Sequence, residues 1–378
     1  MASGVYIHIP FCEHICHYCD FNKVFLKGQP VNEYLNSLEE EIQQTLERYP
    51  SNDIRSIFVG GGTPTAINIK QLERLLESIK RYINPVNDKL EYTFEANPGE
   101  TLTKEKIKLL YDAGVNRISF GVQSFDNKIL QQIGRAHRKE DIFKSVDWAK
   151  EIGFNNVNLD LMYSLPGQTI SQVEETLQEA FSLNVDHFSA YSLIVEPKTV
   201  FFNLQKKGKL HLPSQEEEVT MFEHVIEQMK KHGYNQYEIS NFAKPGMESV
   251  HNLTYWNNEE YYGFGAGAHS YIDGKRITNA GPLNKYITEV ARHGQGVTES
   301  HEVTQQEKME EEMFLGLRKI KGVSKGAFFN KFNEDIHDRF HSQIIEQQRK
   351  GLLEEDEHYI RLTHRGMLLG NEVFQAFI

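Results

Sequence analysis

The sequence has few cysteines, no long apolar run and less positive than negative charge. It contains 3 cysteines in 378 residues, an odd number that argues against the disulfide framework of a secreted domain. Its apolar runs fall short of the roughly 18 residues of a transmembrane helix. The N-terminus lacks the basic and apolar regions of a secretion signal. We therefore expect a cytoplasmic protein with no integral membrane segment.

The charge and the composition exclude further classes of protein. Lys and Arg number 41 against 53 Asp and Glu, a net charge of −12, so we expect no nucleic-acid partner. With 39 % hydrophobic and 25 % charged residues, the chain is neither disordered nor fibrous. Its length suits two domains, or one large domain with an appendage.

All three cysteines lie within one octapeptide, CEHICHYC, as Cys12, Cys16 and Cys19. Cysteines that only fill a core would not be expected to cluster in this way, so a metal or a metal cluster is the better interpretation. A C-x3-C-x2-C spacing lets one loop hold three corners of a 4Fe–4S cluster. Three thiolates on four irons leave one iron open to a small molecule.

Zinc is the alternative for these cysteines. His8, His14 and His17 lie close by in the sequence, so a site of three cysteines and one histidine is conceivable. Structural zinc sites, however, usually take two separated pairs of ligands, which this run does not provide. The spacing therefore favours the iron–sulfur cluster.

The spacing of the cysteines, with the aromatic Tyr18 before the last of them, resembles the signature of the radical S-adenosylmethionine (SAM) family. In that family the open iron chelates the amino and carboxylate groups of SAM. Reduction of the cluster then cleaves SAM to a 5′-deoxyadenosyl radical. The resemblance implies that this protein positions its reactants while the cofactors supply the chemistry.

Strand and helix patterns alternate over the first half of the chain. The predicted strands are Val5–Ile9, Ile54–Val59, Tyr92–Ala96, Arg117–Gly121, Asn156–Leu161 and His187–Leu193. Helical spacing of apolar residues lies between several of them, and such alternation predicts a parallel sheet. These six units resemble the partial (β/α)6 barrel of radical SAM enzymes, so we expect an α/β fold with this barrel over residues 1–205.

Polar and glycine-rich segments follow five of the predicted strands, at the edge where parallel barrels place their chemistry. The Gly60–Thr65 segment lacks the lysine of a P-loop, so phosphate binding is not supported, but its glycines let the backbone approach a ligand. By itself a triple glycine is most often a turn. In radical SAM proteins a segment at this position binds the amino group of SAM, and this one resembles it.

The resemblance extends to the oxygen-independent coproporphyrinogen III oxidase-like branch of the family. It implies that SAM is contacted by Tyr6, Tyr18, Gly62, Thr63, Glu95, Gln123, Arg135 and Asp160. Glu95 or Asp160 would accept from ribose hydroxyls, and Arg135 would pair with a carboxylate. The alternative for each charged residue is a surface salt bridge or a helix cap.

Two subgroups of this branch, the oxidases and the HemW haem chaperones, share most of these motifs. The oxidases have a further cysteine where this chain has Phe21, and an extension before the cluster loop where only 11 residues precede Cys12. Residues 251–256 match the H-N-x-x-Y-W motif of HemW. These features favour the chaperones, so we assign no catalytic residue and expect no coproporphyrinogen oxidase activity.

The H-N-x-x-Y-W motif suggests a haem surface. An imidazole is a common iron ligand, and Tyr255 and Trp256 offer flat faces to a macrocycle, so the resemblance implies that His251, Tyr255 and Trp256 contact haem. The alternative is a packed aromatic segment with His251 as a buried residue. The iron ligand stays open, since other candidates are His14, His17 and His269.

The second half divides into two predicted regions. Residues 206–300 form a barrel-edge and haem-motif region; in it residues 240–285 show little periodicity and are expected to line a site rather than a core. Residues 301–378, with helices at Glu307–Leu317 and Phe340–Arg349 and strands within Leu352–Leu362, resemble a winged-helix module. Because Glu310–Glu312 and Glu354–Glu357 make this module acidic, we expect a lid or a docking surface for a protein.

Three functions follow as hypotheses. The leading one is a haem chaperone that binds haem and a SAM-ligated 4Fe–4S cluster and delivers haem to acceptor haemoproteins, with an electron donor and a homodimer as further partners. The second is an anaerobic coproporphyrinogen III oxidase, which uses radical chemistry for an oxidative decarboxylation. The third is an interaction protein whose cysteines bind zinc.

Overall fold

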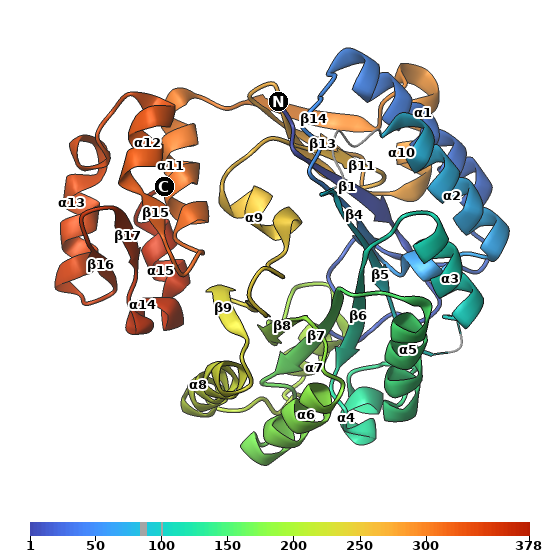
Figure 1. Cartoon of the computed structure of the whole chain (residues 1–378), viewed down its shortest axis with the longest axis horizontal. Helices are drawn as coiled ribbons and strands as arrows, with labels where there is room; N and C mark the ends of the chain where they lie inside the picture. Colours follow the sequence, from blue (N-terminus) through green and yellow to red (C-terminus); the bar gives the residue numbers. More distant parts are fainter. Residues whose placement is uncertain (84–88, 100) are drawn as a thin grey trace.

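A single twelve-stranded sheet forms the centre of the molecule, with helices packed along its convex side (Figure 1). The computed structural model describes residues 1–83, 89–99 and 101–378. The strand order is β14-β13-β12-β11-β1-β4-β5-β6-β7-β8-β10-β9. Since β14 and β9 lie at opposite ends of this order, the described strands form an open, partial barrel.

The six predicted parallel strands are confirmed as the middle of this sheet. They are β1 (Gly4–Ile9), β4 (Ser56–Gly61), β5 (Glu91–Ala96), β6 (Arg117–Gln123), β7 (Val157–Tyr163) and β8 (His187–Ser192). Each pairs in parallel with the next. The second strand begins at Ser56 rather than Ile54 and continues to Gly61. The first two glycines of the glycine segment are therefore the last residues of β4.

The connecting helices form because their apolar residues recur every three to four positions and face the sheet. They include α1 (Val31–Arg48), α2 (Ile69–Tyr82), α3 (Lys104–Asp112), α4 (Asn127–Gln132), α5 (Lys139–Ile152), α6 (Ile170–Ser182), α7 (Val200–Lys206) and α8 (Gln215–Lys231). In α1, Leu35, Leu38 and Ile42 are buried. In α2, Asn68 and Gln71 form a reciprocal capping box that satisfies the first backbone donors.

The prediction that residues 240–285 line a site rather than a core is wrong in part, because these residues form strands of the sheet and contribute to its core. They contain β10 (Asn241–Ala243), α9 (Val250–Trp256), β11 (Tyr261–Phe264), β12 (His269–Ile272) and β13 (Lys275–Asn279). β11 pairs in parallel with β1, and Tyr262 and Phe264 are buried. A Cβ on Gly263 would lie 1.8 Å from the carbonyl oxygen of His269, so glycine permits this close packing of short strands. The sheet is completed by β9 (Asn235–Glu238) and β14 (Val297–Glu302), while α10 (Leu283–His293) packs against α1.

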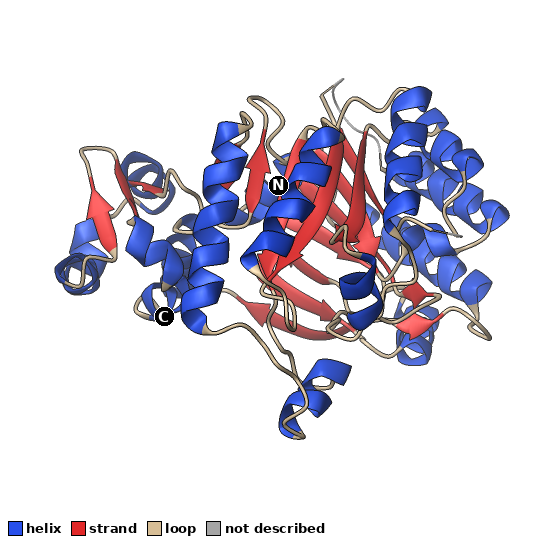
Figure 2. Ribbon diagram, turned by 90° about the horizontal axis from the view of Figure 1, so that it is seen from below, coloured by secondary structure: helices blue, strands red, loops and turns tan. Residues whose placement is uncertain are grey.

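The C-terminal residues form a module with its own apolar core, which faces the open side of the partial barrel and contacts both β9 and β13 (Figures 1 and 2). Its elements are α11 (Gln305–Gly316), β15 (Val323–Ser324), α12 (Lys325–Phe332), α13 (Ile336–Arg349), β16 (Leu353–Glu355), β17 (Tyr359–Leu362), α14 (His364–Leu368) and α15 (Gly370–Gln375). This is the predicted arrangement of helices followed by a hairpin. Within the described part of the chain, no helix is both long and apolar enough to cross a bilayer.

Candidate functional site

The three cysteines lie together on the loop that follows β1. Cys12 ends β2 (Phe11–Cys12), which pairs with β3 (Val24–Phe25). Cys12 is buried and Cys16 and Cys19 are half-buried, all as free thiols. The pKa of Cys12 is raised to about 11, chiefly by burial and also by the neighbouring Cys19 and Cys16, while the Thr63 hydrogen bond and Arg135 act in the opposite direction. A cationic partner such as iron would favour the thiolate, so these residues suit the cluster that their spacing predicts.

Within residues 1–83, 89–99 and 101–378, no group of three or more His, Cys, Asp or Glu side chains is placed to hold one metal ion. His8 instead hydrogen-bonds the hydroxyl of Tyr6 through Nδ1 (2.9 Å) and the carbonyl of Asn22 through Nε2 (2.7 Å). His8 therefore holds the cysteine loop against β1, and Tyr6 is positioned by it.

The other two histidines near the cysteines differ in their surroundings. His17 packs edge-on against Phe201, and its Nδ1 lies 2.9 Å from the carbonyl oxygen of Gln132. A Cβ on Gly134 would meet the His17 ring at 2.8 Å, so glycine is needed there. His14 is exposed to solvent.

Gly62 and Thr63 contact Cys12 from the end of β4. A Cβ on Gly62 would lie 3.0 Å from the Cys12 sulfur and 2.8 Å from the backbone carbonyl carbon of Pro10. The Thr63 hydroxyl donates to the Cys12 sulfur at 3.8 Å. The glycine segment thus packs directly against the cysteine loop, and the absence of a side chain at residue 62 is what allows it.

Asn97 connects this segment to Arg135; the sequence places it just after the third predicted strand but assigns it no role. Its Nδ2 donates to the Thr63 hydroxyl at 2.7 Å, and its Oδ1 accepts from Arg135 Nη1 at 2.8 Å. The Arg135 Nε is buried and has no acceptor among the described residues. This free donor fits the carboxylate that the sequence assigns to Arg135. Asn97 directly follows β5, and this position after a strand is the one feature of the sequence that pointed to it.

Gln123 lies at an irregular point of the sheet, where the register between β6 and β7 shifts. Its φ is 69°, which is strained for a residue with a side chain, and such strain clusters at functional sites. A Cβ on Gly121 would lie 2.6 Å from Asn97, 2.9 Å from Arg135 and 3.3 Å from Gln123. The bare backbone of Gly121 therefore lets these three polar side chains converge.

Glu95 and Asp160 line the interior of the partial barrel. Glu95 accepts from the backbone N–H of Gly61 at 3.0 Å, and Asp160 accepts from Asn158 (2.8 Å) and Ser119 (3.3 Å). Burial raises the pKa of both carboxyl groups, that of Glu95 to about 8. Both lie near Arg135, and both are available to accept hydrogen bonds from a ligand's hydroxyls.

The structure brings most of the predicted SAM residues to one edge of the sheet. Tyr18 lies beside Cys16 and Arg135, which links the cysteine loop to the loop after α4. Gly62 and Thr63 follow β4, whereas Glu95 and Gln123 lie in the last residues of β5 and β6, and Asp160 lies in the middle of β7 rather than at its end. Besides Asn97, the residues missed by the sequence analysis are Ser119 and Asn158, which hold Asp160, and both alternate with apolar residues along buried strands.

The H-N-x-x-Y-W motif forms α9, which lies between the sheet and the C-terminal module (Figure 1). The Glu91 carboxylate accepts from the Ser249 hydroxyl and from the backbone N–H groups of Val250 and His251. An anion at a helix N-terminus is stabilising, so Glu91 anchors α9 to the start of β5.

His251 is buried, and both of its ring nitrogens have partners. Nδ1 lies 2.9 Å from the Ser56 hydroxyl and Nε2 lies 3.0 Å from the Tyr255 hydroxyl, while the ring stacks on Phe58. Burial lowers the pKa of His251 to about 3. This geometry suits a residue that positions Tyr255. The exposed His269, by contrast, contacts the Thr278 hydroxyl through Nδ1 at 3.1 Å.

Trp256 packs against the C-terminal module. The guanidinium of Arg318 lies 5.1 Å from the centre of the Trp256 ring and 4.8 Å from that of Phe374. Tyr255 and Trp256 also line a pocket of about 380 Å³. The motif thus joins the sheet to the module through His251 at one end and Trp256 at the other.

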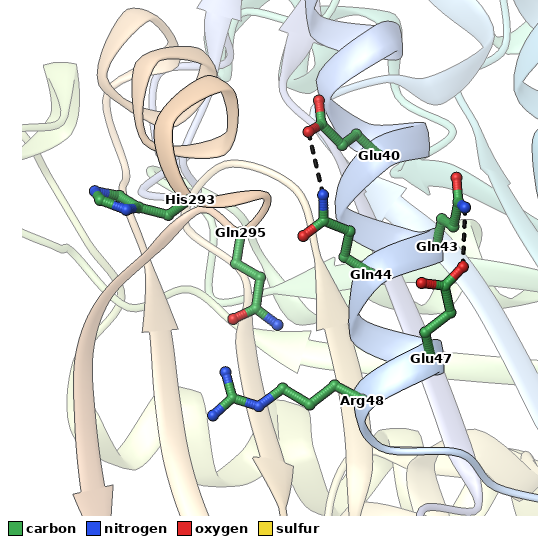
Figure 3. Close-up of a pocket in the computed structure, with 7 residues that line it drawn as sticks. All are labelled: Glu40, Gln43, Gln44, Glu47, Arg48, His293 and Gln295. Atoms are coloured by element: carbon green, nitrogen blue, oxygen red, sulfur yellow. Dashed lines mark hydrogen bonds between the residues drawn. The ribbon is translucent and has the colours of Figure 1, made fainter.

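Two further pockets lie elsewhere. One, of about 360 Å³, opens beside Cys19 and is lined by Phe21, Lys23 and Lys198 among others; the Phe21 side chain is 61 % exposed. The other, of about 620 Å³, is a polar depression between α1 and the end of α10 with the segment after it (Figure 3). There the Glu40 carboxylate accepts a hydrogen bond from Gln44, and the Glu47 carboxylate accepts one from Gln43. These polar side chains are therefore already paired within α1.

Comparisons with known proteins find relatives of both parts of the chain. The Radical SAM superfamily matches residues 6–180, and the HemN C-terminal domain matches residues 303–369. The chain is 55 % identical to the heme chaperone HemW of Bacillus subtilis, covering 100 % of this chain and 99 % of that protein. It is 32 % identical to HemW of Escherichia coli, covering 99 % and 98 %. Among solved structures, the coproporphyrinogen III oxidase HemN of E. coli superposes with a TM-score of 0.86 at 26 % identity, covering 100 % of this chain and 90 % of that one.

Proposed function

We propose, since this chain belongs to the HemW heme chaperone family and carries a radical SAM domain, that it binds haem and delivers it to acceptor haemoproteins in the cytosol. The similarity to HemW proteins along the whole chain is the observation that carries this proposal. The close structural likeness to HemN supports the same fold with a related, tetrapyrrole-directed role. An electron donor and a homodimer belong to the proposal as partners.

The cofactor part of the proposal assigns a 4Fe–4S cluster to Cys12, Cys16 and Cys19. SAM would lie against Gly62 and Thr63, with Tyr6, Tyr18, Glu95, Gln123, Arg135 and Asp160 around it. The unpaired Nε of Arg135 and the bare backbone at Gly62 and Gly121 support this assignment. When bound, these cofactors supply one-electron chemistry. The chain's own residues bind and orient them and exclude water.

Loss of one cluster ligand tests this assignment. In Cys16→Ala we expect loss of the brown iron–sulfur absorption and of SAM binding, while the fold is retained, because Cys16 is half-buried and outside the apolar core. Iron content and circular dichroism measure the two effects. A Cys16→Ala protein that still reconstitutes a stable 4Fe–4S cluster would contradict the ligand assignment.

The haem part of the proposal is that the H-N-x-x-Y-W motif on α9 binds haem. Tyr255 and Trp256 line a pocket and would contact haem, and His251 would act as a positioning residue for Tyr255. The axial iron ligand is then a different group. The absorption spectrum of the haem complex, measured for variants of His14, His17 and His269, tests which histidine it is.

An anaerobic turnover assay separates the chaperone from an oxidase. Reconstituted protein with a confirmed 4Fe–4S spectrum is incubated with coproporphyrinogen III, SAM and a reductant, and the porphyrins are separated by chromatography. We expect no protoporphyrinogen, because Phe21 stands where the oxidases have a further cysteine. Multiple turnovers to protoporphyrinogen would overturn the proposed function.

A further inference from the structure

Asn252, the second residue of the H-N-x-x-Y-W motif, is hydrogen-bonded toward the barrel. Its Nδ2 donates to the hydroxyl oxygen of Tyr237, on β9, at 3.3 Å. The backbone N–H of Ser249 donates to the same oxygen at 3.4 Å. The Tyr237 hydroxyl in turn lies 2.9 Å from Nε2 of His187, on β8. One tyrosine hydroxyl therefore connects the motif helix to the parallel strands.

From His187 the hydrogen bonds continue to Asp160. Nδ1 of His187 lies 2.6 Å from Oδ1 of Asn158. Nδ2 of Asn158 donates to Oδ1 of Asp160 at 2.8 Å. The His187 and Asn158 side chains are both fully buried. The whole set, which we call the Tyr237 network, consists of Asn252, Tyr237, His187, Asn158 and Asp160.

The donors of the Tyr237 network all point toward Asp160. Asn158 uses its amide nitrogen on the Asp160 carboxylate, so its oxygen is the atom that accepts, and Nδ1 of His187 carries the proton. Burial lowers the pKa of His187 well below its ordinary value, and so does the charge of Arg117, so the ring is neutral. Its bare Nε2 therefore accepts from the Tyr237 hydroxyl. Aligned hydrogen bonds strengthen one another, so a change at one end is felt at the other.

The Tyr237 network holds one oxygen of Asp160 and leaves the other available. Oδ1 accepts the 2.8 Å bond from Asn158, whereas Oδ2 accepts a longer bond of 3.3 Å from the Ser119 hydroxyl. A carboxylate oxygen has two lone pairs, so Oδ2 can also accept from a ligand hydroxyl. Asp160 is paired across the sheet with Gly121, the residue around which Arg135 and other predicted SAM residues converge.

Tyr237 is also held by the C-terminal module. The backbone N–H of Ile320 donates to the Tyr237 carbonyl oxygen at 3.1 Å. The next residue, Glu238, forms an antiparallel β-bridge with Lys319. Since β9 is the last strand of the sheet, its position depends on the module on one side and on β10 on the other.

We propose that Tyr237 and Asn252 are positioning residues of the SAM site. Acting through His187 and Asn158, they hold the Asp160 carboxylate in the orientation that accepts from the ribose of SAM. This inference rests on the proposed function, since it deepens the SAM site of that function. It gives the asparagine of the motif a role separate from the haem contacts assigned to its aromatic residues. The affinity for SAM therefore depends on how α9 and the C-terminal module hold β9.

SAM binding to four reconstituted full-length proteins tests the Tyr237 network. Besides the unaltered protein, Tyr237→Phe removes the hydroxyl and keeps the ring, and Asn252→Ala removes one donor while favouring the helix. Tyr234→Phe is the matched control, because the buried Tyr234 hydroxyl donates to the Val185 carbonyl (2.7 Å), outside the network. Equilibrium dialysis measures the SAM affinity, iron analysis the cluster content, and urea denaturation the free energy of unfolding.

We expect Tyr237→Phe to weaken SAM binding about fivefold and Asn252→Ala about threefold, because mutations along such a network pass on part of their cost. The iron content should not change, since none of these residues contacts the cysteines. Tyr234→Phe should bind SAM as the unaltered protein does, although it too loses a buried hydrogen bond and some stability.

A double-mutant cycle with Asp160→Ala separates positioning from a general loss of stability. Asp160→Ala alone should weaken SAM binding about thirtyfold, because a hydrogen bond to a charged group is lost. In the Asp160→Ala background, Tyr237→Phe should have no further effect on SAM affinity, since the network acts through Asp160. If Asp160→Ala does not keep its cluster, the comparison of Tyr237→Phe and Asn252→Ala with Tyr234→Phe decides the question.

Three results overturn this inference and leave the proposed function intact. The first is a SAM affinity that neither Tyr237→Phe nor Asn252→Ala changes. The second is an equal loss of SAM affinity in Tyr234→Phe, and the third is a Tyr237→Phe effect that keeps its full size in the Asp160→Ala background. If the reconstituted unaltered protein binds no SAM, the cofactor part of the proposed function itself fails, and the inference fails with it.

Discussion

Arg135 donates from Nη1 to Oδ1 of Asn97 at 2.8 Å, across the ends of two separate parts of the barrel. Asn97 in turn donates to Thr63, whose hydroxyl donates to the Cys12 sulfur. A continuous hydrogen-bonded chain therefore runs from a predicted cluster ligand to a predicted SAM ligand. The cluster assignment and the SAM assignment are therefore coupled through Asn97, which belongs to neither set of predicted residues.

Asn97→Ala should weaken SAM binding about tenfold and leave the iron content unchanged. The reason is that Arg135 loses the acceptor that orients its guanidinium, and a hydrogen bond to a charged group contributes about 1.5–3 kcal/mol. Equilibrium dialysis with SAM and iron analysis measure the two quantities. Asn284→Ala, at an exposed position of α10, is the control. An unchanged SAM affinity in Asn97→Ala would show that Asn97 does not position Arg135 for SAM.

Gly62→Ala should lower both cluster occupancy and stability. The new Cβ would lie 2.8 Å from the backbone of Pro10 and 3.0 Å from the Cys12 sulfur, and such overpacking costs about 1–3 kcal/mol. Gly326→Ala on α12 is the control, because nothing lies within 4 Å of a Cβ there. Iron content after reconstitution and urea denaturation report the effect. Equal iron content in the two variants would show that the loop tolerates the methyl group.

His251→Phe should lower the free energy of unfolding by about 2 kcal/mol, because the substitution leaves the buried Ser56 hydroxyl without its partner. The ring still stacks on Phe58, so the helix is expected to stay in place. The position of the haem absorption band should not change, since neither nitrogen of His251 is free to bind iron. A shifted band with unaltered stability would instead identify His251 as an axial ligand.

Glu41 should make stability depend on pH between about 4.5 and 7. Burial raises its folded-state pKa from 4.5 to about 7, although Gly265, Gly296, Tyr286 and Asn279 all donate to it. The folded state therefore binds the proton more tightly than the unfolded state, so this contribution is fully present below pH 4.5 and is lost as the pH rises through 7. A shift of this size corresponds to about 3 kcal/mol.

Urea denaturation at a series of pH values, on the unaltered protein and on Glu41→Gln, measures this contribution. The difference in free energy of unfolding between the two proteins should change across that window and be constant above it. A difference that is independent of pH would show that Glu41 is ionised throughout, with its four donors outweighing burial.

The parallel core of the fold could be predicted from the sequence, because short strand patterns such as Arg117–Gly121 alternate with stretches of helical periodicity. The cysteine site followed from spacing alone. The contribution of Asn97 could not be predicted, since it depends on which strand ends become neighbours in space. Glu41 was equally hidden: on a helix rich in glutamate it resembles a solvent-exposed residue, and only the packing of residues 265–296 buries it.

The pairing of β1 with both β4 and β11 has a consequence for the order in which the chain is made. β1 leaves the ribosome before both of its partners and is joined first, on one side, by residues 56–61. Its other edge is covered only when residues 261–264 emerge, about 10–40 s later at the usual rate of synthesis. Until residues 261–264 emerge, the nascent protein therefore exposes an open strand edge beside its cysteine loop, the kind of edge that pairs with other chains.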